Sequence, residues 1–107
     1  MLFRSFTHPF LRSSNAVKHW KFEDLKNGWV NIYCPTLHEG ISDFKTKREV
    51  YVELKQIESD LKGAGFTGWA AWTYIINPHI MKMYAKVGAQ PYRLNIKQET
   101  IWFKKEL

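Results

Sequence analysis

The clearest pattern of apolar positions lies between residues 46 and 62, where apolar side chains recur at intervals of three and four and predict one buried face of an α-helix. These residues are Val50, Leu54, Ile57 and Leu61. Thr46 and Glu49 form the sequence T-x-x-E, a capping box that predicts the start of this helix. Gly63 and Gly65 predict its end, because glycine readily adopts the left-handed conformation that closes helices.

The segment from Trp29 to Leu37 alternates between two sets of residues in the way that predicts a β-strand. One face would carry Trp29, Asn31 and Tyr33, and the other Val30, Ile32 and Cys34. Pro35 cannot donate a ladder hydrogen bond, so it should lie at the end, an edge or a bulge of this strand. The sequence Lys-Asn-Gly at residues 26–28 is a turn signal, which predicts a hairpin with an earlier strand at about residues 18–23.

A second strand is predicted at Phe66 to Ile76, where the mostly apolar run from Ala70 to Ile76 is long enough for a buried strand. Because one helix separates this strand from the strand that begins at Trp29, the two strands should be parallel neighbours, at about residues 29–35 and 68–76. The sequence from Thr100 to Phe103 predicts a final, antiparallel strand. The last four residues, Lys-Lys-Glu-Leu, are interpreted as a solvated tail.

A second helix is predicted over residues 78–87. Asn77 is a favourable N-cap residue, and Pro78 suits the first helical position because its missing N–H would have no helical partner there. Gly88 stands where a left-handed residue would end the helix.

Together these elements predict one α/β domain over residues 1–107, with a twisted mixed sheet of about four or five strands and two main helices. Residues 1–17 mix phenylalanine and arginine and are expected to form an N-terminal arm or a short helix. The apolar fraction of 45% and the aromatic fraction of 16% argue against disorder of the whole chain.

The formal net charge is +6, with sixteen Lys and Arg against ten Asp and Glu. This balance favours anionic partners, but the cations are scattered and accompany no RNA-binding or helix-turn-helix signature, so nucleic-acid binding is not expected. The single cysteine, Cys34, excludes an internal disulfide. No apolar run approaches the roughly 20 residues of a membrane span, so a cytoplasmic protein without a membrane segment is expected.

The segment from Trp69 to Tyr92 carries the most specific motif in the chain. From Asn77 it runs N-P-H-I-M-K-M-Y-A-K-V-G-A, which places Tyr84 and Gly88 at defined intervals. This resembles the distal part of the acetyl-CoA-binding core of the GNAT superfamily of N-acetyltransferases, N-x-x-A-x-x-L-Y-x-x-x-G-F. The order of elements is similar to a truncated GNAT domain that lacks most of its N-terminal strand and helices, as in small, divergent acetyltransferase-like proteins of bacteriophages.

The resemblance implies that acetyl-CoA lies where the two parallel strands diverge, with its pyrophosphate over the start of the helix at residues 46–62. A helix N-terminus presents unpaired N–H groups and a partial positive charge to an anion. The family places an R/Q-x-x-G-x-G/A loop there, whereas residues 45–51 read K-T-K-R-E-V-Y, without glycine. We therefore expect Lys45, Lys47 and Arg48 to bind phosphates by charge, while the three residues after Arg48 obstruct a backbone cradle.

Family members commonly use a tyrosine at the position of Tyr84 to protonate the departing CoA thiolate, so Tyr84 is the candidate general acid. The alternative is that Tyr84 completes an apolar stripe with Ile80 and holds its hydroxyl at the surface. Asn77 would bond the pantetheine or the turn backbone, or act only as a helix cap. The remaining cofactor contacts that the resemblance implies are backbone amides for the thioester carbonyl, at Trp72, Thr73 and Tyr74.

His38 and Glu39 follow the first parallel strand, where family members often hold the base that deprotonates the substrate amine. The pKa of a histidine lies near neutrality without tuning, whereas Glu39 would need burial. The same residues also fit an ordinary polar loop. Cys34 and His38 could pair as nucleophile and base, but a lone buried cysteine is far more often part of a core. The four histidines lack the spacing of a zinc site, so no metal is expected.

Two functions follow. The first is transfer of an acetyl group from acetyl-CoA to a primary amine, with His38 or Glu39 as base and Tyr84 as acid. The second is a catalytically inactive GNAT-fold binding module, such as a bacteriophage protein that engages a host or virion protein and resides in the host cytoplasm or the virion. Because the short N-terminal half leaves one sheet face less covered, a homodimer through that face or the C-terminal strand is a further expectation.

Overall fold

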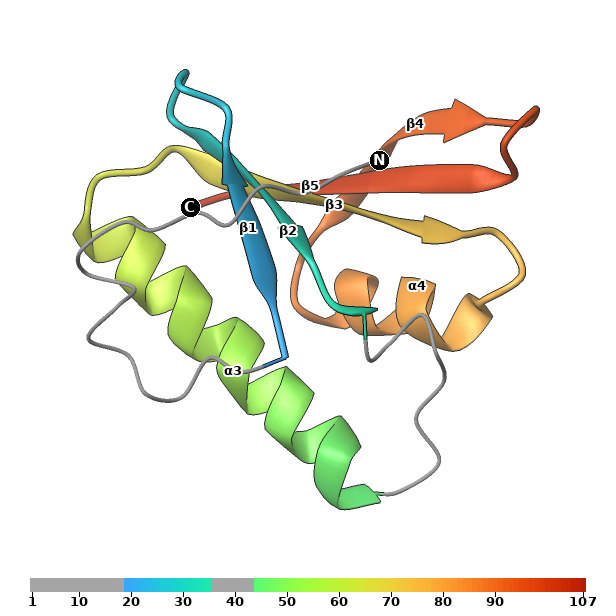
Figure 1. Ribbon diagram of the computed structural model, residues 1–107, viewed down its shortest axis with the longest axis horizontal. Helices are drawn as coiled ribbons and strands as arrows, with labels where there is room; N and C mark the ends of the chain where they lie inside the picture. The colour runs from blue at the N-terminus through green and yellow to red at the C-terminus, as the bar shows by residue number, and fades with distance from the viewer. Residues whose placement is uncertain (1–18, 36–43) are drawn as a thin grey trace.

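The structure, a computed structural model, describes residues 19–35 and 44–107 (Figure 1). The elements are, in order, β1 (Lys21–Asp24), β2 (Trp29–Tyr33), α3 (Phe44–Gly63), β3 (Gly68–Tyr74), α4 (Pro78–Lys86), β4 (Gln90–Asn95) and β5 (Thr100–Glu106). The five strands form one sheet in the order β1-β2-β3-β5-β4. Strands β2 and β3 are parallel, and the other neighbouring pairs are antiparallel. The predicted mixed sheet of about four or five strands with two main helices is therefore confirmed.

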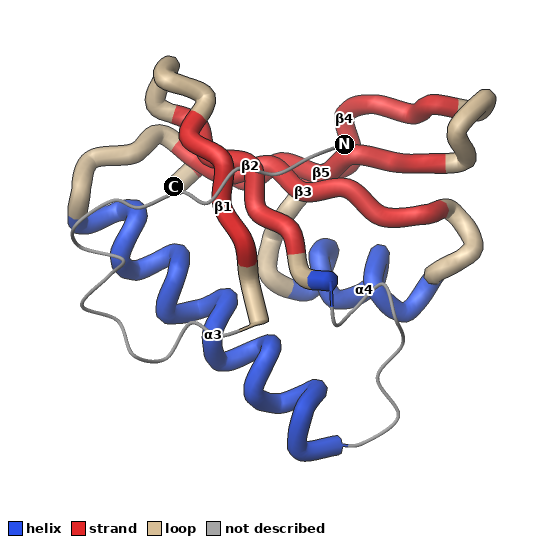
Figure 2. Tube along the Cα trace, in the orientation of Figure 1, coloured by secondary structure: helices blue, strands red, loops and turns tan. Residues whose placement is uncertain are grey.

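Helices α3 and α4 cover the same face of the sheet (Figure 1, Figure 2). The predicted apolar stripe of α3 is fully buried, at Val50, Leu54, Ile57 and Leu61. Every second residue of the two parallel strands meets this layer, because successive side chains of a strand point to opposite faces. These strand residues are Val30, Ile32, Trp69 and Ala71. Full burial of each large aliphatic side chain is worth roughly 1.5–3 kcal/mol, so this layer is the main source of stability.

Helix α4 begins and ends close to the predicted residues. Gly88 has a φ of +92°, and its N–H donates to the carbonyl of Ala85 at 3.0 Å. The N–H of Ala89 donates to the carbonyl of Tyr84 at 2.9 Å. This pair of bonds is a Schellman motif, in which a left-handed glycine lets the chain satisfy the last helical carbonyls. Gly88 is thus confirmed as the residue that ends the helix.

The start of α3 differs from the prediction. The helix begins at Phe44, so Thr46 lies inside its first turn rather than at its N-cap, and the predicted capping box is wrong in position. The helix ends at Gly63, as the sequence predicts, and Gly65 follows with a φ of +86°.

Strand β4 and the length of β5 are two further differences. The first five residues of β4 are exposed, so no apolar alternation marks this edge strand in the sequence. Strand β5 continues to Glu106, which makes most of the predicted solvated tail part of the sheet. The reason lies at Lys105, whose side chain forms an ion pair with the buried Glu58 of α3.

The predicted N-terminal arm at residues 1–17 lies outside the described residues. Within the two described ranges, no helix combines the length and the apolar character that a membrane span requires.

Candidate functional site

Strands β2 and β3 pair only at their beginnings. Their register joins Trp29 to Gly68, Val30 to Trp69 and Asn31 to Ala70. Beyond these pairs the two strands diverge, and β3 continues beside β5 as far as Tyr74 (Figure 1). The sheet therefore opens at the carboxyl ends of its parallel strands, which is where open α/β sheets commonly bind ligands.

A groove with a volume of about 300 Å³ lies between the beginning of α3 and helix α4. Both helices contribute side chains to it, namely Lys47, Tyr51, His79, Ile80, Lys82, Met83 and Lys86. Ile80 is buried and Met83 is partly buried, so the groove has an apolar floor. Its size is at the lower end for ligand sites, which suits part of an elongated ligand.

The groove is positively charged. Lys47, Lys82 and Lys86 lie along it, and no acidic residue is among the described side chains that line it. Neither helix has an acidic residue in its first turn, so the positive ends of both helix dipoles remain unneutralised there. Lys86 Nζ lies 5.7 Å from the centroid of the Tyr51 ring, a cation–π contact that holds this lysine beside the groove wall. The arrangement suits an anion that carries an apolar portion.

Of the three cations predicted to bind phosphate together, only Lys47 lines the groove. Lys45 and Arg48 are exposed on α3 outside it, because consecutive helical residues point in different directions. The structure instead adds Lys82 and Lys86, which sequence reasoning missed. Their spacing of four on one helix, which places both on one face, was the available signal.

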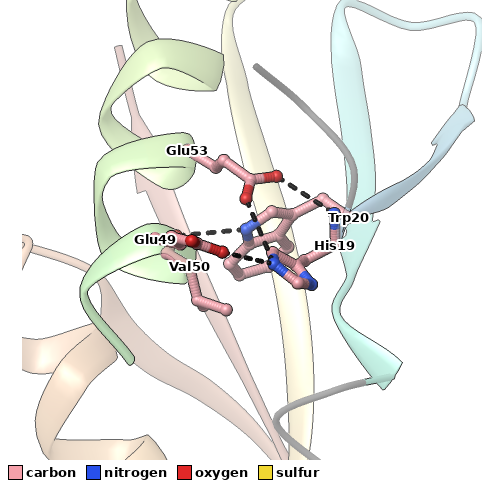
Figure 3. Close-up of polar contacts among 5 residues, drawn as sticks. All are labelled: His19, Trp20, Glu49, Val50 and Glu53. Carbon is pink, nitrogen blue, oxygen red and sulfur yellow. Dashed lines mark hydrogen bonds and ion pairs between the residues drawn. The ribbon is translucent and has the colours of Figure 1, made fainter. Parts of the chain in front are cut away.

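Glu49 and Glu53 of α3 hold His19, which lies two residues before the start of β1 (Figure 3). His19 Nε2 lies 3.2 Å from Glu49 Oε2 and 3.6 Å from Glu53 Oε2, and the His19 backbone N–H donates to Glu53 Oε1 at 3.0 Å. The indole N–H of Trp20 donates to the carbonyl of Val50 at 3.2 Å. Glu49 and the Val50 carbonyl therefore hold the start of the β1 segment against α3. Of the three residues expected to obstruct a phosphate cradle, only Tyr51 lines the groove.

Tyr84 is enclosed in the core, with 1% of its surface exposed. Its ring centroid lies 5.9 Å from that of Trp69 and 5.4 Å from that of Phe103. Burial, together with the nearby Cys34 and Tyr33, raises the pKa of the Tyr84 hydroxyl far above its usual value. The alternative with a surface hydroxyl is therefore wrong. A buried phenol of this kind gives up its proton less readily than an exposed one.

Asn77 directly precedes α4, as predicted, but its side chain makes no capping hydrogen bond. Its backbone carbonyl instead accepts the N–H groups of Ile80 at 3.2 Å and Met81 at 3.3 Å. The start of the helix is therefore set by the backbone and by Pro78.

Trp72, Thr73 and Tyr74 lie on two faces of the sheet. Thr73 is fully buried on the face that the helices cover, whereas Trp72 and Tyr74 point to the opposite face. The three residues pair with β5 through Trp102, Ile101 and Thr100. The groove lies on the helix side of the sheet, so the side chains of Trp72 and Tyr74 do not face it.

His38 and Glu39, the candidate bases, lie outside the described residues. Cys34 is fully buried on the core face after β2, the environment of a structural cysteine. Among the residues that the structure describes, no three His, Cys, Asp or Glu side chains are grouped so as to hold a metal ion.

The sequence matches no protein-family model, and it matches no curated protein. The fold is similar to the crystal structure of a domain from Methanocaldococcus jannaschii DSM 2661, with a TM-score of 0.65 and 14% sequence identity. The match covers 82% of this chain and 55% of that chain, so this chain spans little more than half of its length. At this identity the likeness shows the fold alone.

Proposed function

We propose that this is an acetyltransferase-like protein that binds acetyl-CoA in the groove between α3 and α4. The observation that carries the proposal is the groove itself, where three lysines lie along an apolar floor on the helix-covered side of a sheet whose strands β2 and β3 diverge. The motif around Asn77, Tyr84 and Gly88 is the independent sequence support for the same ligand class.

Different residues of the groove would contact different parts of acetyl-CoA. Lys47, Lys82 and Lys86 would pair with the phosphates, since charge-assisted hydrogen bonds to phosphate are the stronger class. Ile80 and Met83 would contact the less polar pantetheine. The bound cofactor supplies an activated acetyl group as a thioester, and the acceptor that we propose is a primary amine.

A second function, the catalytically inactive binding module, is favoured by the enclosure of Tyr84. Tyr84 is 1% exposed, so its ring contributes to core packing while its hydroxyl is not available to a ligand as a general acid. The exposed Ile76 and Ile96, each 77% exposed, are suitable apolar anchors for a protein partner, such as a host or virion protein.

Isothermal titration calorimetry with acetyl-CoA and with CoA tests the first function. We expect saturable binding of both ligands that weakens as salt is raised, because the lysines are near the surface and their charges are screened. Absence of binding at millimolar cofactor would overturn the proposal. Where binding is found, mass spectrometry of incubated amines separates the two functions, since only the enzyme adds an acetyl group to them.

A further inference from the structure

The sheet face opposite the helices carries a group of aromatic side chains on neighbouring strands. The ring of Tyr33 stacks on that of Trp72, with 5.6 Å between centroids and 13° between planes. Tyr74 meets the same indole edge-on at 5.1 Å. Trp102 of β5 is the direct ladder partner of Trp72, so its side chain lies on the same face. The face therefore presents several ring systems held in place by one another.

A hollow of about 340 Å³ lies among these rings. It is lined by Trp72, Tyr74, Gln98, Thr100 and Trp102. Three aromatic rings, one amide and one hydroxyl make up its described lining, without a charged side chain. This combination suits a flat ring that stacks on an indole and exchanges hydrogen bonds through its edge, which is the chemistry of a nucleobase.

Cations lie on the same sheet face as this hollow and in the turn beside it. Arg93 of β4 is the ladder partner of Trp102 and therefore shares its face. Lys104 follows Trp102 by two residues on β5, so it lies on that face as well. Lys104 Nζ lies 5.3 Å from the centroid of the Tyr92 ring. Lys97 stands next to Gln98 in the turn between β4 and β5, where Glu99 is the acidic residue. The cations outnumber the acids around an uncharged aromatic hollow, and this distribution complements an anionic ligand with a neutral ring.

We propose that this hollow binds a nucleotide, with its base against Trp102 and Trp72 and its phosphate on Arg93, Lys97 or Lys104. The source of the nucleotide is either a free mononucleotide or single-stranded nucleic acid. The site lies on the opposite side of the sheet from the α3–α4 groove and is independent of it. The scattered cations of the sequence predict no nucleic-acid binding, whereas the β4–β5 hairpin places Arg93 and Lys104 on the sheet face that carries the hollow and Lys97 in the adjoining turn.

Two titrations of the full chain test the proposal. Fluorescence anisotropy with a labelled oligothymidine reports single-stranded nucleic acid, and calorimetry with AMP and UMP reports free nucleotides. Binding of the oligonucleotide alone supports the proposal and assigns a nucleic-acid ligand, whereas binding of the mononucleotides also supports it and assigns a free nucleotide. Failure of both probes to bind, at millimolar nucleotide and at low salt, would overturn it.

Variants separate the hollow from general surface charge. Trp102→Ala should weaken binding about tenfold or more, because stacking on an aromatic side chain contributes strongly to the binding of each base, and Trp102→Phe should retain most of the affinity. Gln98→Ala changes an exposed side chain, so its effect is measured in a folded protein even where Trp102→Ala unfolds. It should weaken binding several-fold.

The matched control concerns the rim. Changing Arg93 and Lys97 to Ala should lower affinity and reduce its salt dependence, since phosphate contacts release bound counterions. Changing Lys55 and Lys62 of α3 to Ala removes the same charge from exposed positions elsewhere. Apart from the effect of a lower overall positive potential, this change should leave affinity within about twofold. Equal losses in the two double variants would contradict a site at the hollow.

Discussion

Lys105, near the end of the last strand, lies 2.5 Å from Glu58 of α3, measured from Nζ to Oε2. The same carboxylate oxygen accepts the indole N–H of Trp69 at 3.1 Å. Glu58 is buried, and its charge is compensated by Lys105 and the neutral indole donor on the covered face of the sheet, with the exposed Lys55 as a second cation 3.6 Å from Oε1. This contact joins α3 to both β3 and β5.

Glu58→Ala should lower the free energy of unfolding by about 3 kcal/mol, because it leaves a partly buried ammonium group and a buried indole N–H without their acceptor. Urea denaturation followed by circular dichroism measures the loss. Glu58→Gln keeps an acceptor for the indole and should cost less. As the control, Lys55→Ala removes the exposed partner of Glu58 and should change stability by less than about 1 kcal/mol. An unchanged midpoint for Glu58→Ala would contradict this account.

Tyr84 should make the protein sensitive to alkali. Its pKa is raised by burial, so the folded state keeps this proton at a pH where the unfolded chain, with the usual value of 10.0, has lost it. The stabilisation is complete below about pH 10 and is then lost as pH rises, at about 1.4 kcal/mol per pH unit.

Denaturant melts of the wild type and Tyr84→Phe at neutral pH and above pH 10 measure this effect. Phenylalanine cannot ionise, so the stability difference between the two proteins should shift in favour of the variant as pH rises. Subtracting the two proteins removes the contribution of lysines and exposed tyrosines. A pH-independent difference would show that the Tyr84 hydroxyl meets similar surroundings in both states.

The groove between α3 and α4 gives a sharp test of cofactor binding. Changing Lys82 and Lys86 to Ala should raise the Kd for CoA roughly tenfold, because contacts with charged groups are worth more than neutral hydrogen bonds. Changing Lys45 and Arg48 to Ala removes the same charge from exposed positions outside the groove and should change the Kd by less than about threefold. Calorimetry at constant ionic strength compares the two, and the reverse ranking would place the phosphates at the start of α3.

Gly68 should tolerate no side chain. A Cβ there would meet the carbonyl oxygen of Lys105 and would lie 2.5 Å from the Trp29 ring. Gly68→Ala should therefore cost about 1–3 kcal/mol through overpacking. Gly63→Ala is the matched control, since its Cβ would meet no atom within 4 Å, and alanine there should be neutral or slightly stabilising. Thermal melts of the two variants should rank clearly apart.

The sequence predicts the elements that follow one simple period. The stripe of α3 and the alternation of β2 are examples, because a buried face imposes its spacing on the residues that form it. Strand β4 escaped prediction because it is an edge strand with exposed residues and contains Pro91, which weakens a strand assignment.

The site is predicted less well than the fold, because its residues meet only through tertiary packing. Lys47 joins Lys82 and Lys86 in the groove although more than thirty positions separate them. His19 likewise meets Glu49 at a separation of 30 residues, and no local pattern announces such a pair. The segment around Tyr84 that carries the resemblance lies on α4, which also lines the groove, but helix packing decides which cations lie there.

The short pairing of β2 with β3 divides the sheet mechanically. Three residue pairs join these strands, whereas seven join β3 to β5. The β1–β2 hairpin is therefore joined to the larger β3–β5–β4 part of the sheet by a short stretch of pairing. Hydrogen bonds from His19 and Trp20 to α3 also hold the hairpin in place. Under mechanical load or local opening the β2–β3 hydrogen bonds should break first, and their amide protons should exchange with solvent before those of the β3–β5 ladder.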